Sequence, residues 1–147
     1  MSTNQLLTSF INKSDRMVFK WIDYFEVYEK AFHAYKNKPI TFLEIGIQNG
    51  GSLQMWRKFF GPEAKIIGID IDPNCKALEN EGFEIWIGNQ ADPNFWMDFK
   101  SKNPSLDLVL DDGGHTMEQQ IVTFQSLFPI LSNGGTYVCE DTHTSYF

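Results

Sequence analysis

The sequence predicts an α/β fold in which helices cover both faces of a doubly wound parallel sheet. Three observations support this prediction. From Pro39 onward, short apolar segments alternate with helical ones, turns rich in glycine and proline separate them, and the apolar segments are nearly continuous. Strands of that kind are buried on both faces, as in parallel sheets. Right-handed crossovers and the usual doubly wound arrangement give the strand order 3-2-1-4-5.

The elements follow one another as strand, turn and helix. Gly61 ends the first helix of this region, Asp92-Pro93 suits the start of another, and Thr116 with Gln119 forms a capping-box pattern. The predicted strands are residues 40–47, 65–71, 83–87, 106–110 and 136–140. The predicted helices are residues 53–60, 73 to about 82, 93 to about 100 and 116 to about 131, and a turn is expected at 133–135.

A different pattern precedes the sheet. Residues 15–35 carry aromatic side chains at helical spacing, and these predict a helix that packs on the core. The aromatic positions are Trp21, Tyr24, Phe25, Tyr28, Phe32 and Tyr35. The sequence therefore predicts an N-terminal helical segment over residues 1–38 and a sheet-containing core over residues 39–147.

Composition excludes several classes of function. The chain of 147 residues has 12 basic and 19 acidic side chains, a net charge of −7, which disfavours a nucleic-acid partner. No apolar run approaches the length of a membrane span, and no signal peptide is recognisable. Cys75 and Cys139 match no metal or redox spacing, which favours free thiols. We expect a soluble, cytoplasmic protein.

Acidic residues follow the fourth and fifth predicted strands. Asp111 and Asp112 end the apolar run LDLVL, and Glu140 and Asp141 end TYVCE. Ligands of such sheets bind at the carboxyl ends of the strands, where strand order reverses. We expect Asp112, Glu140 and Asp141 to converge there as a magnesium-like site with oxygen ligands, with His115 three residues after Asp112. The alternative is that these acids are solvated loop residues.

The glycine loop after the first predicted strand does not indicate a dinucleotide. Gln48 stands where the fingerprint G-x-G-x-x-G needs its middle glycine, and no GK[ST] follows to make a P-loop. Asp70, at the end of the second strand, is placed to bind ribose hydroxyls, and amides near Ser52 are placed to bind a carboxylate. A purely structural glycine turn is the alternative.

Four segments in order resemble a known family. LEIGIQNGGSLQMW, GIDIDP, DLVLDDGGH and EDTHTSY are similar to motifs of class I S-adenosylmethionine-dependent methyltransferases, whose fold is Rossmann-like. More narrowly, they resemble the metal-dependent branch that includes macrolide sugar O-methyltransferases and cephalosporin hydroxylase proteins. The resemblance covers roughly residues 40–146.

The resemblance implies a role for each matching residue. His115 would be the general base, and magnesium would bind to Asp112, Glu140 and Asp141. The cofactor S-adenosylmethionine would have its ribose on Asp70. The methionine end of the cofactor would lie against Glu44, Gly46, Gln48, Asn49, Gly50 and Ser52, and further cofactor contacts would come from Asn89, Gln90 and Asp111.

The sequence departs from the family in two places. Gly88-Asn89-Gln90 replaces a common G-D-Q, so the adenine contact would either be weaker or come from the Asn89 amide. Family members also continue past Tyr146 with a final strand pair, which this chain, ending at Phe147, is expected to lack. Strand 136–140 would then be an exposed edge. Either a partner subunit, as in a homo-oligomer, covers it, or the chain is a shortened form of a longer enzyme.

These observations predict transfer of a methyl group to a hydroxyl of a small molecule, a sugar or natural product, with magnesium assistance. Two other functions stay open. One is a truncated remnant that binds S-adenosylmethionine without turnover, and the other is an NAD-type oxidoreductase. Neither nucleic acid nor a membrane is expected as a partner.

Overall fold

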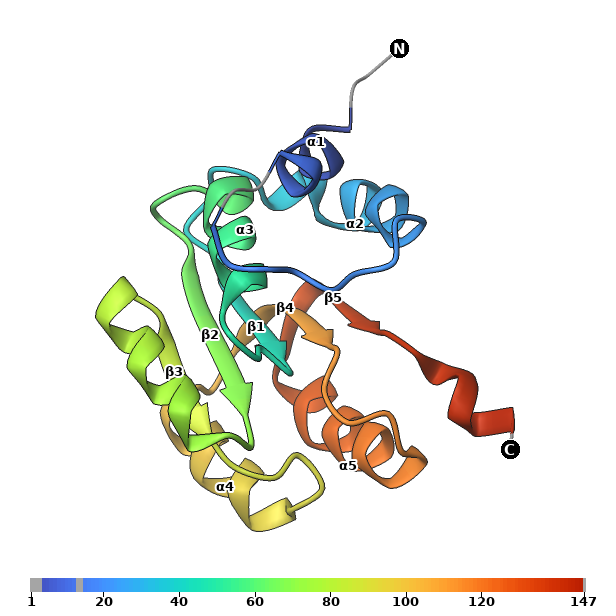
Figure 1. Ribbon diagram of the computed structural model, residues 1–147. Helices are drawn as coiled ribbons and strands as arrows, with labels where there is room; N and C mark the ends of the chain where they lie inside the picture. Colours follow the sequence, from blue (N-terminus) through green and yellow to red (C-terminus); the bar gives the residue numbers. More distant parts are fainter. Residues whose placement is uncertain (1–3, 13–14, 147) are drawn as a thin grey trace.

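A computed structural model of the chain describes residues 4–12 and 15–146. Its centre is a five-stranded sheet with the order β3-β2-β1-β4-β5, in which all neighbouring strands are parallel (Figure 1). The predicted fold class and strand order are therefore confirmed. The strands are β1 (Thr41–Ile45), β2 (Lys65–Asp70), β3 (Glu84–Ile87), β4 (Leu106–Asp111) and β5 (Leu131–Cys139).

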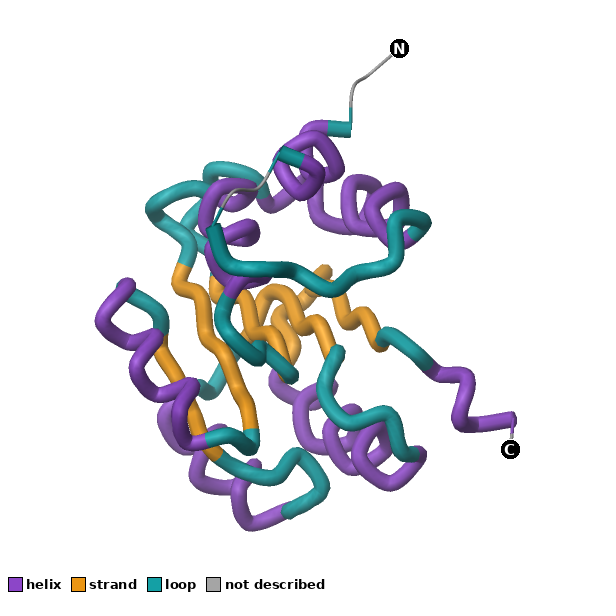
Figure 2. Tube along the Cα trace, in the orientation of Figure 1, coloured by secondary structure: helices purple, strands orange, loops and turns teal. Residues whose placement is uncertain are grey.

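Helices cover both faces of the sheet. Figures 1 and 2 show α1, α2 and α3 on one face and α4 and α5 on the other. The α-helices are α1 (Gln5–Ile11), α2 (Tyr24–Phe32), α3 (Gly51–Phe60), α4 (Pro93–Lys102) and α5 (Met117–Leu127). The 3₁₀ helices are η1 (His33–Tyr35), η2 (Pro73–Glu81), η3 (Phe128–Ile130) and η4 (Thr142–Tyr146).

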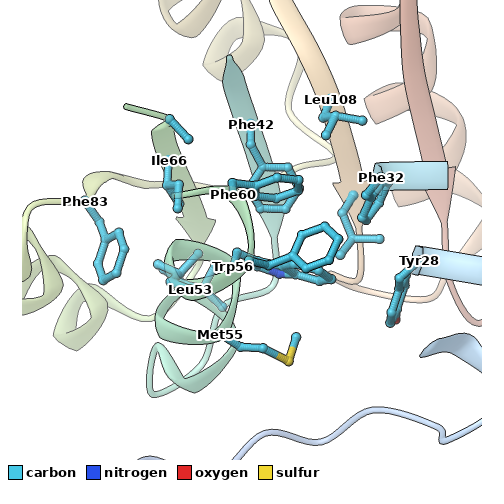
Figure 3. Packing of buried hydrophobic residues seen from close by; sticks show 14 of the residues in the cluster. Tyr28, Phe32, Phe42, Leu53, Met55, Trp56, Phe60, Ile66, Phe83 and Leu108 are labelled. Atoms are coloured by element: carbon cyan, nitrogen blue, oxygen red, sulfur yellow. The ribbon is translucent and has the colours of Figure 1, made fainter. Parts of the chain in front are cut away.

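Aromatic rings form the core on the face that carries α1, α2 and α3. Trp56 of α3 lies at its centre, with ring centroids 5.4 Å from Tyr28, 5.6 Å from Phe32, 5.5 Å from Phe42 and 5.8 Å from Phe60 (Figure 3). Such ring contacts stabilise the core beyond the gain from burying the large apolar area of aromatic side chains. Because two of these rings belong to α2, the N-terminal segment shares one core with the sheet. The division at residues 38 and 39 stays a prediction.

A second core fills the opposite face. Trp96 and Phe99 of α4 and Leu127 of α5 pack with strand residues such as Leu43 and Val109. Both faces of β1 and β4 are therefore buried, which explains their continuous apolar sequences. Among residues 4–12 and 15–146, no helix combines the length and apolar character that crossing a membrane requires.

The predicted capping signals are confirmed. Asp92 accepts a hydrogen bond from the Asn94 amide at 2.9 Å, and Thr116 and Gln119 form the complete capping box. Gly61 and Gly82, in positive-φ conformations, end α3 and η2. Local hydrogen bonding therefore sets these helix ends, as the residue types indicated.

The prediction of one helix over residues 15–35 is wrong in its first part. Helix α2 begins only at Tyr24, and residues 17–21 form no regular element. Trp21, predicted to pack on the core, is 70% exposed, whereas Phe25 and Phe32 are buried as predicted. The cause is a buried ion cluster, described below, that draws this part of the chain across the sheet. We call residues 16–22 the strap.

The turn predicted at 133–135 is an irregularity within β5. Leu131 pairs with Leu106, but the next pair joins Thr136 to Leu108, so the intervening residues bulge from the ladder. Gly134 adopts the positive φ of 81° that this bulge needs. In the described part of the chain, β5 is an edge strand. Its coverage by a partner subunit stays a prediction.

Candidate active site

The sheet register brings the predicted acidic residues to one edge. Ile45, Asp111 and Cys139 are aligned across β1, β4 and β5, so the residues that follow them leave the sheet side by side. The Asp112 amide donates to the Ile45 carbonyl at 3.0 Å, and the Glu140 amide donates to the Asp111 carbonyl at 2.9 Å. These bonds extend the ladder by one residue and fix where each acidic side chain begins.

Gly46 allows two loops to meet at this edge. Its φ is 82°, and a Cβ at this position would overlap the carbonyl oxygen of Asp112. Only glycine combines that conformation with such a close approach of backbone. Gly46 is therefore required for the contact between the loops that follow β1 and β4.

A buried lysine lies among the carboxylates. Lys20, in the strap, has a side chain only 2% exposed, and its Nζ lies 2.6 Å from Asp112 Oδ2, 3.0 Å from Glu140 Oε1 and 3.2 Å from Glu44 Oε1. Sequence analysis missed this residue. The signal that points to it is a single cation inside the apolar run Met17–Ile22, where a charge is expensive unless it is paired.

Two further donors complete this buried group. The Tyr28 hydroxyl donates to Glu140 Oε1, and the Ser52 hydroxyl donates to Glu44 Oε2 at 2.7 Å. Burial raises the pKa of Glu44 and raises that of Glu140 to about 7, although Lys20 opposes both shifts. For Lys20, burial favours the neutral amine, but the three carboxylates outweigh it and raise the pKa. We name Lys20, Glu44 and Glu140 the lysine cluster.

A second group lies beside the lysine cluster and is more exposed. Asp112, His115 and Asp141 each offer one ligand atom, and these atoms lie within 4.8 Å of one another. His115 Nε2 is 3.5 Å from Asp141 Oδ2, and the Tyr24 hydroxyl donates to Asp141 Oδ1 at 2.8 Å. Burial, together with this bond to Asp141, raises the pKa of Tyr24 to about 12. We name Asp112, His115 and Asp141 the open triad.

Buried polar groups hold the loop between Asp112 and His115. Gln90 donates to Asp111 Oδ1 at 3.0 Å and to the Thr123 hydroxyl at 3.0 Å, and it accepts from the Gly114 amide at 2.6 Å. Burial raises the pKa of Asp111. The observed contacts of Gln90 and Asp111, both predicted as cofactor residues, thus shape the loop that carries His115.

A cavity of about 310 Å³ opens at the ends of β1, β2 and β3. Asp70 is in its wall, and Asp70 Oδ2 accepts from the amides of Ile47 at 3.0 Å and Gln48 at 2.9 Å. Of the predicted cofactor residues, those in the lining are Gly46, Gln48, Asp70, Asn89 and Gln90. We name it the first cavity.

A larger cavity of about 520 Å³ lies on the other side of Asp112. The strap residues Phe19 and Trp21 form part of its wall, and His115 and Asp141 form another part. Gln48, Asp112 and Gly113 line both this second cavity and the first. The two cavities therefore meet at Asp112, a member of the open triad, and such adjoining sites suit the transfer of a group between two ligands.

Four other predicted cofactor residues lie in β1, in the glycine loop and at the start of α3. Glu44 is fully buried, and Ser52 is nearly so. Asn49 and Ser52 line a space of only about 20 Å³ between the strap and the glycine loop. Gly50 caps the start of α3 with a φ of 79° and faces the Leu78 side chain. Gly46 and Gln48, which line the first cavity, also line the space beside the strap, so the two sets of predicted cofactor residues adjoin each other.

Comparisons with known proteins agree with this geometry. A family model described as a methyltransferase domain matches residues 43–142. A rhamnosyl-tetracenomycin 3'-O-methyltransferase of Streptomyces olivaceus is 35% identical over 86% of this chain and 34% of its own length. Demethylmacrocin O-methyltransferase of Streptomyces fradiae is 36% identical over 82% of this chain and 32% of its own.

A solved structure extends the likeness to three dimensions. MycE methyltransferase from the mycinamycin biosynthetic pathway, in complex with Mg, SAH and mycinamycin VI, superposes with a TM-score of 0.80 and is 30% identical. The match covers 98% of this chain and 38% of MycE. The chain thus spans about a third of the length of the curated relatives.

The fold and the two adjoining cavities define a Rossmann-like protein of the class I methyltransferase type. The chain belongs to the methyltransferase domain family and is related to macrolide sugar O-methyltransferases of the MycE type, whose class I fold it shares.

Proposed function

We propose that the protein transfers the methyl group of S-adenosylmethionine to a hydroxyl of a small molecule, a sugar or another part of a natural product, with the help of Mg²⁺. The observation that carries this proposal is the meeting of two cavities at the open triad. One cavity would hold the methyl donor and the other the acceptor. Family membership supports the donor, and the named substrates of the relatives support the acceptor class.

The first cavity suits the donor. At about 310 Å³ it lies at the low end of the range for ligand pockets, and it stands at the point where strand order reverses. Asp70 accepts the glycine-loop amides at Oδ2 and the Asp72 amide at Oδ1, and its carboxylate lines the cavity, where ribose hydroxyls would donate to the remaining lone pairs. Asn89 lines the same cavity, and its side-chain amide would contact the adenine.

The donor set of the open triad fits Mg²⁺. Such an ion prefers oxygen ligands, so Asp112 and Asp141 would hold it and water would complete its shell. When bound, the ion lowers the pKa of a hydroxyl that coordinates it. Glu140, also predicted as a ligand, uses Oε1 for its hydrogen bonds to Lys20 and Tyr28, and its role as a third ligand stays a prediction.

His115 is then left to take the proton. In the transfer, the acceptor oxygen forms a bond to the methyl carbon while the carbon–sulfur bond breaks and leaves its electron pair on sulfur. The hydroxyl proton moves to the His115 imidazole, whose Nε2 faces Asp141 at 3.5 Å. The chain contributes alignment and a base, and no covalent intermediate is required.

The second cavity supports an acceptor with both polar and apolar parts. Phe19 and Trp21 form an aromatic wall, and the open triad forms a polar one. A glycoside has the same division, since its ring carries hydroxyls as well as apolar C–H faces. By their names, the relatives act on a rhamnosyl tetracenomycin, which is a glycoside, and on demethylmacrocin.

Calorimetric titration with S-adenosylhomocysteine tests the donor site. We expect one-to-one binding, and a substitution Asp70→Ala, which removes the ribose contact, should weaken it about 10-fold or more. Asp98→Ala, a change of an exposed acid remote from the cavity, is the matched control.

Release of S-adenosylhomocysteine in the presence of glycoside acceptors and Mg²⁺ then tests turnover. Methyl transfer that depends on Mg²⁺ supports the whole proposal. Binding without turnover on any hydroxyl acceptor would favour a non-catalytic remnant, and a folded protein that binds no S-adenosylhomocysteine would overturn the proposal.

A further inference from the structure

The strap has an alternating pattern of burial. Met17, Phe19 and Trp21 are exposed, whereas Val18 is half-buried and the Lys20 side chain is almost fully buried. An extended chain places successive side chains on opposite sides. Figure 2 shows this segment crossing the sheet from the side of α3 to the side of α2. Lys20 therefore points toward the buried carboxylates, whereas Phe19 and Trp21 are on the solvent-accessible side, where they line the open second cavity.

The strap contacts the site at both ends. Near its start, a Cβ on Gly51 would overlap the Met17 carbonyl, so the backbones of strap and glycine loop touch, and Arg16 pairs with Glu81 at the surface. Toward its end, Lys20 is bonded to Asp112 and Glu140. The surface pair is worth little in stability because water screens it. The buried ion pairs of Lys20 with Asp112 and Glu140 therefore hold the strap more strongly than the surface pair does.

Three carboxylates depend on Lys20 for their charge balance. Glu44, Asp112 and Glu140 come from the ends of three neighbouring strands, and Nζ is within 3.2 Å of an oxygen of each. Without the ammonium group, these charges would repel one another, and the side chains of Glu44 and Glu140 are too deeply buried for water to screen them. Asp112 alone among them also lines both large cavities. Lys20 thus contacts the one acid that the proposed donor, metal and acceptor sites share.

We propose that Lys20 is a positioning residue of the methyl-transfer site: it orients Asp112 and fastens the strap against the glycine loop. This inference rests on the proposed function. Strap residues Met17–Lys20 and loop residues Gly46–Asn49 face each other across a space of only about 20 Å³. The strap therefore supports Gln48, a non-glycine residue held at a φ of 46° where both cavities meet. Release of the strap would free the loop that the methionine end of the donor needs.

Lys20→Met tests this inference, with Lys30→Met as the matched control. Lys30 lies in α2, and its ion pair with Glu26 is exposed. Chymotrypsin reports on the strap without any cofactor, because Phe19 and Trp21 are exposed cleavage sites whose backbone must open to be cut. We expect cleavage after these two residues to be at least 10-fold faster in Lys20→Met and unchanged in Lys30→Met.

Titration with S-adenosylhomocysteine gives the second readout. We expect the affinity of folded Lys20→Met to fall at least 10-fold, and Lys20→Arg, which keeps the charge, to restore part of both the affinity and the protection. A residue that served only stability would lower the melting temperature and leave the affinity of the folded protein unchanged. That result, or a strap as protected as in the wild type, would overturn the inference.

A double variant covers the case in which Lys20→Met does not fold. Lys20→Met combined with Glu140→Gln removes one buried charge of each sign. The amide oxygen introduced at position 140 can still accept the hydrogen bond from the Tyr28 hydroxyl. We expect it to fold with the strap released, and wild-type protection would again overturn the inference. Because the chymotrypsin readout needs no cofactor, it tests Lys20 even if wild-type protein binds no S-adenosylhomocysteine, a result that would refute the proposed function instead.

Discussion

The lysine cluster and the open triad lie side by side but solve the problem of adjacent carboxylates in opposite ways. In the lysine cluster, the side chains of Glu44 and Glu140 are 0% and 4% exposed and share a cation that the chain itself supplies. In the open triad, His115 and Asp141 are 36% and 20% exposed, and among the described residues no lysine or arginine forms an ion pair with Asp141.

The difference teaches which acids are available to a ligand. Acids that are sealed from water need a built-in counter-charge, because an unpaired buried carboxylate would protonate or destabilise the fold. Glu140 also lines the second cavity, but its Oε1 is bonded to Lys20 and Tyr28, whereas Asp141 in the same lining pairs with no lysine or arginine of the described residues and can bind an external cation. Asp112, a member of the open triad, connects the two groups, because its Oδ2 is bonded to Lys20 while the residue lines both cavities. Asp112 thus contacts the Lys20 ammonium group and also belongs to the group that is proposed to bind Mg²⁺.

The largest expected effect concerns the open triad. His115→Ala should lower turnover by about 100- to 10,000-fold, the usual contribution of a general base, and change the affinity for S-adenosylhomocysteine less than about threefold. Single-turnover methyl transfer at saturating Mg²⁺ measures the first quantity, and calorimetry measures the second. His33→Ala, at an exposed histidine of η1, is the control. Undiminished turnover in His115→Ala would remove this residue as the base.

The next effect concerns the lysine cluster and stability instead of chemistry. Glu44→Ala removes one partner of a fully buried ion pair and leaves the Ser52 hydroxyl without its acceptor. We expect the free energy of unfolding to fall by about 3–5 kcal/mol. Urea denaturation followed by circular dichroism measures it. Glu26→Ala, in the exposed pair with Lys30, should change it by less than about 1 kcal/mol. Equal effects of the two substitutions would contradict the contrast in burial.

Asp141→Asn should show the reverse pattern. The affinity for Mg²⁺, measured by calorimetry, should fall at least about 10-fold, because a neutral amide replaces a charged ligand. The free energy of unfolding should change by less than about 1 kcal/mol, since the side chain is partly exposed and Asn tolerates the left-handed backbone of Asp141, at a φ of 51°. A stability loss as large as that of Glu44→Ala, with unchanged Mg²⁺ affinity, would make Asp141 structural.

The sequence was sufficient for the sheet because local signals and global fold agree there. Apolar runs such as LDLVL, and caps such as Thr116 with Gln119, depend on residues within a few positions of each other, and each is found where the pattern placed it. The same holds for the convergence of Asp112 and Glu140, which follows from strand order alone.

What the sequence did not reveal depends on contacts between distant residues. Lys20 meets Asp112 and Glu140 across 92 and 120 positions, and no spacing rule signals such a pair. Helical periodicity through Trp21 was misleading for the same reason, because the tertiary ion cluster overrides local preference. Gln90 illustrates a further limit: its residue type suits a cofactor contact, but its hydrogen bonds hold the loop that carries His115.

The smallest expected effect tests how sharply the two groups are separated. Tyr24 and Tyr28 lie one helical turn apart in α2, and their hydroxyls donate to Asp141 and Glu140, respectively. Tyr24→Phe removes one hydrogen bond from the open triad and should weaken Mg²⁺ binding by about 1 kcal/mol, roughly fivefold, with little loss of stability. Tyr28→Phe removes one hydrogen bond from the lysine cluster. Because Glu140 is buried, the free energy of unfolding should fall by about 1–3 kcal/mol, and the affinity for Mg²⁺ should change less than in Tyr24→Phe. Calorimetry and urea denaturation on both variants give the four values. If both substitutions weakened Mg²⁺ binding equally, Glu140 would act with Asp112 and Asp141 as a metal ligand. Glu140 would then belong with the open triad and not with the lysine cluster.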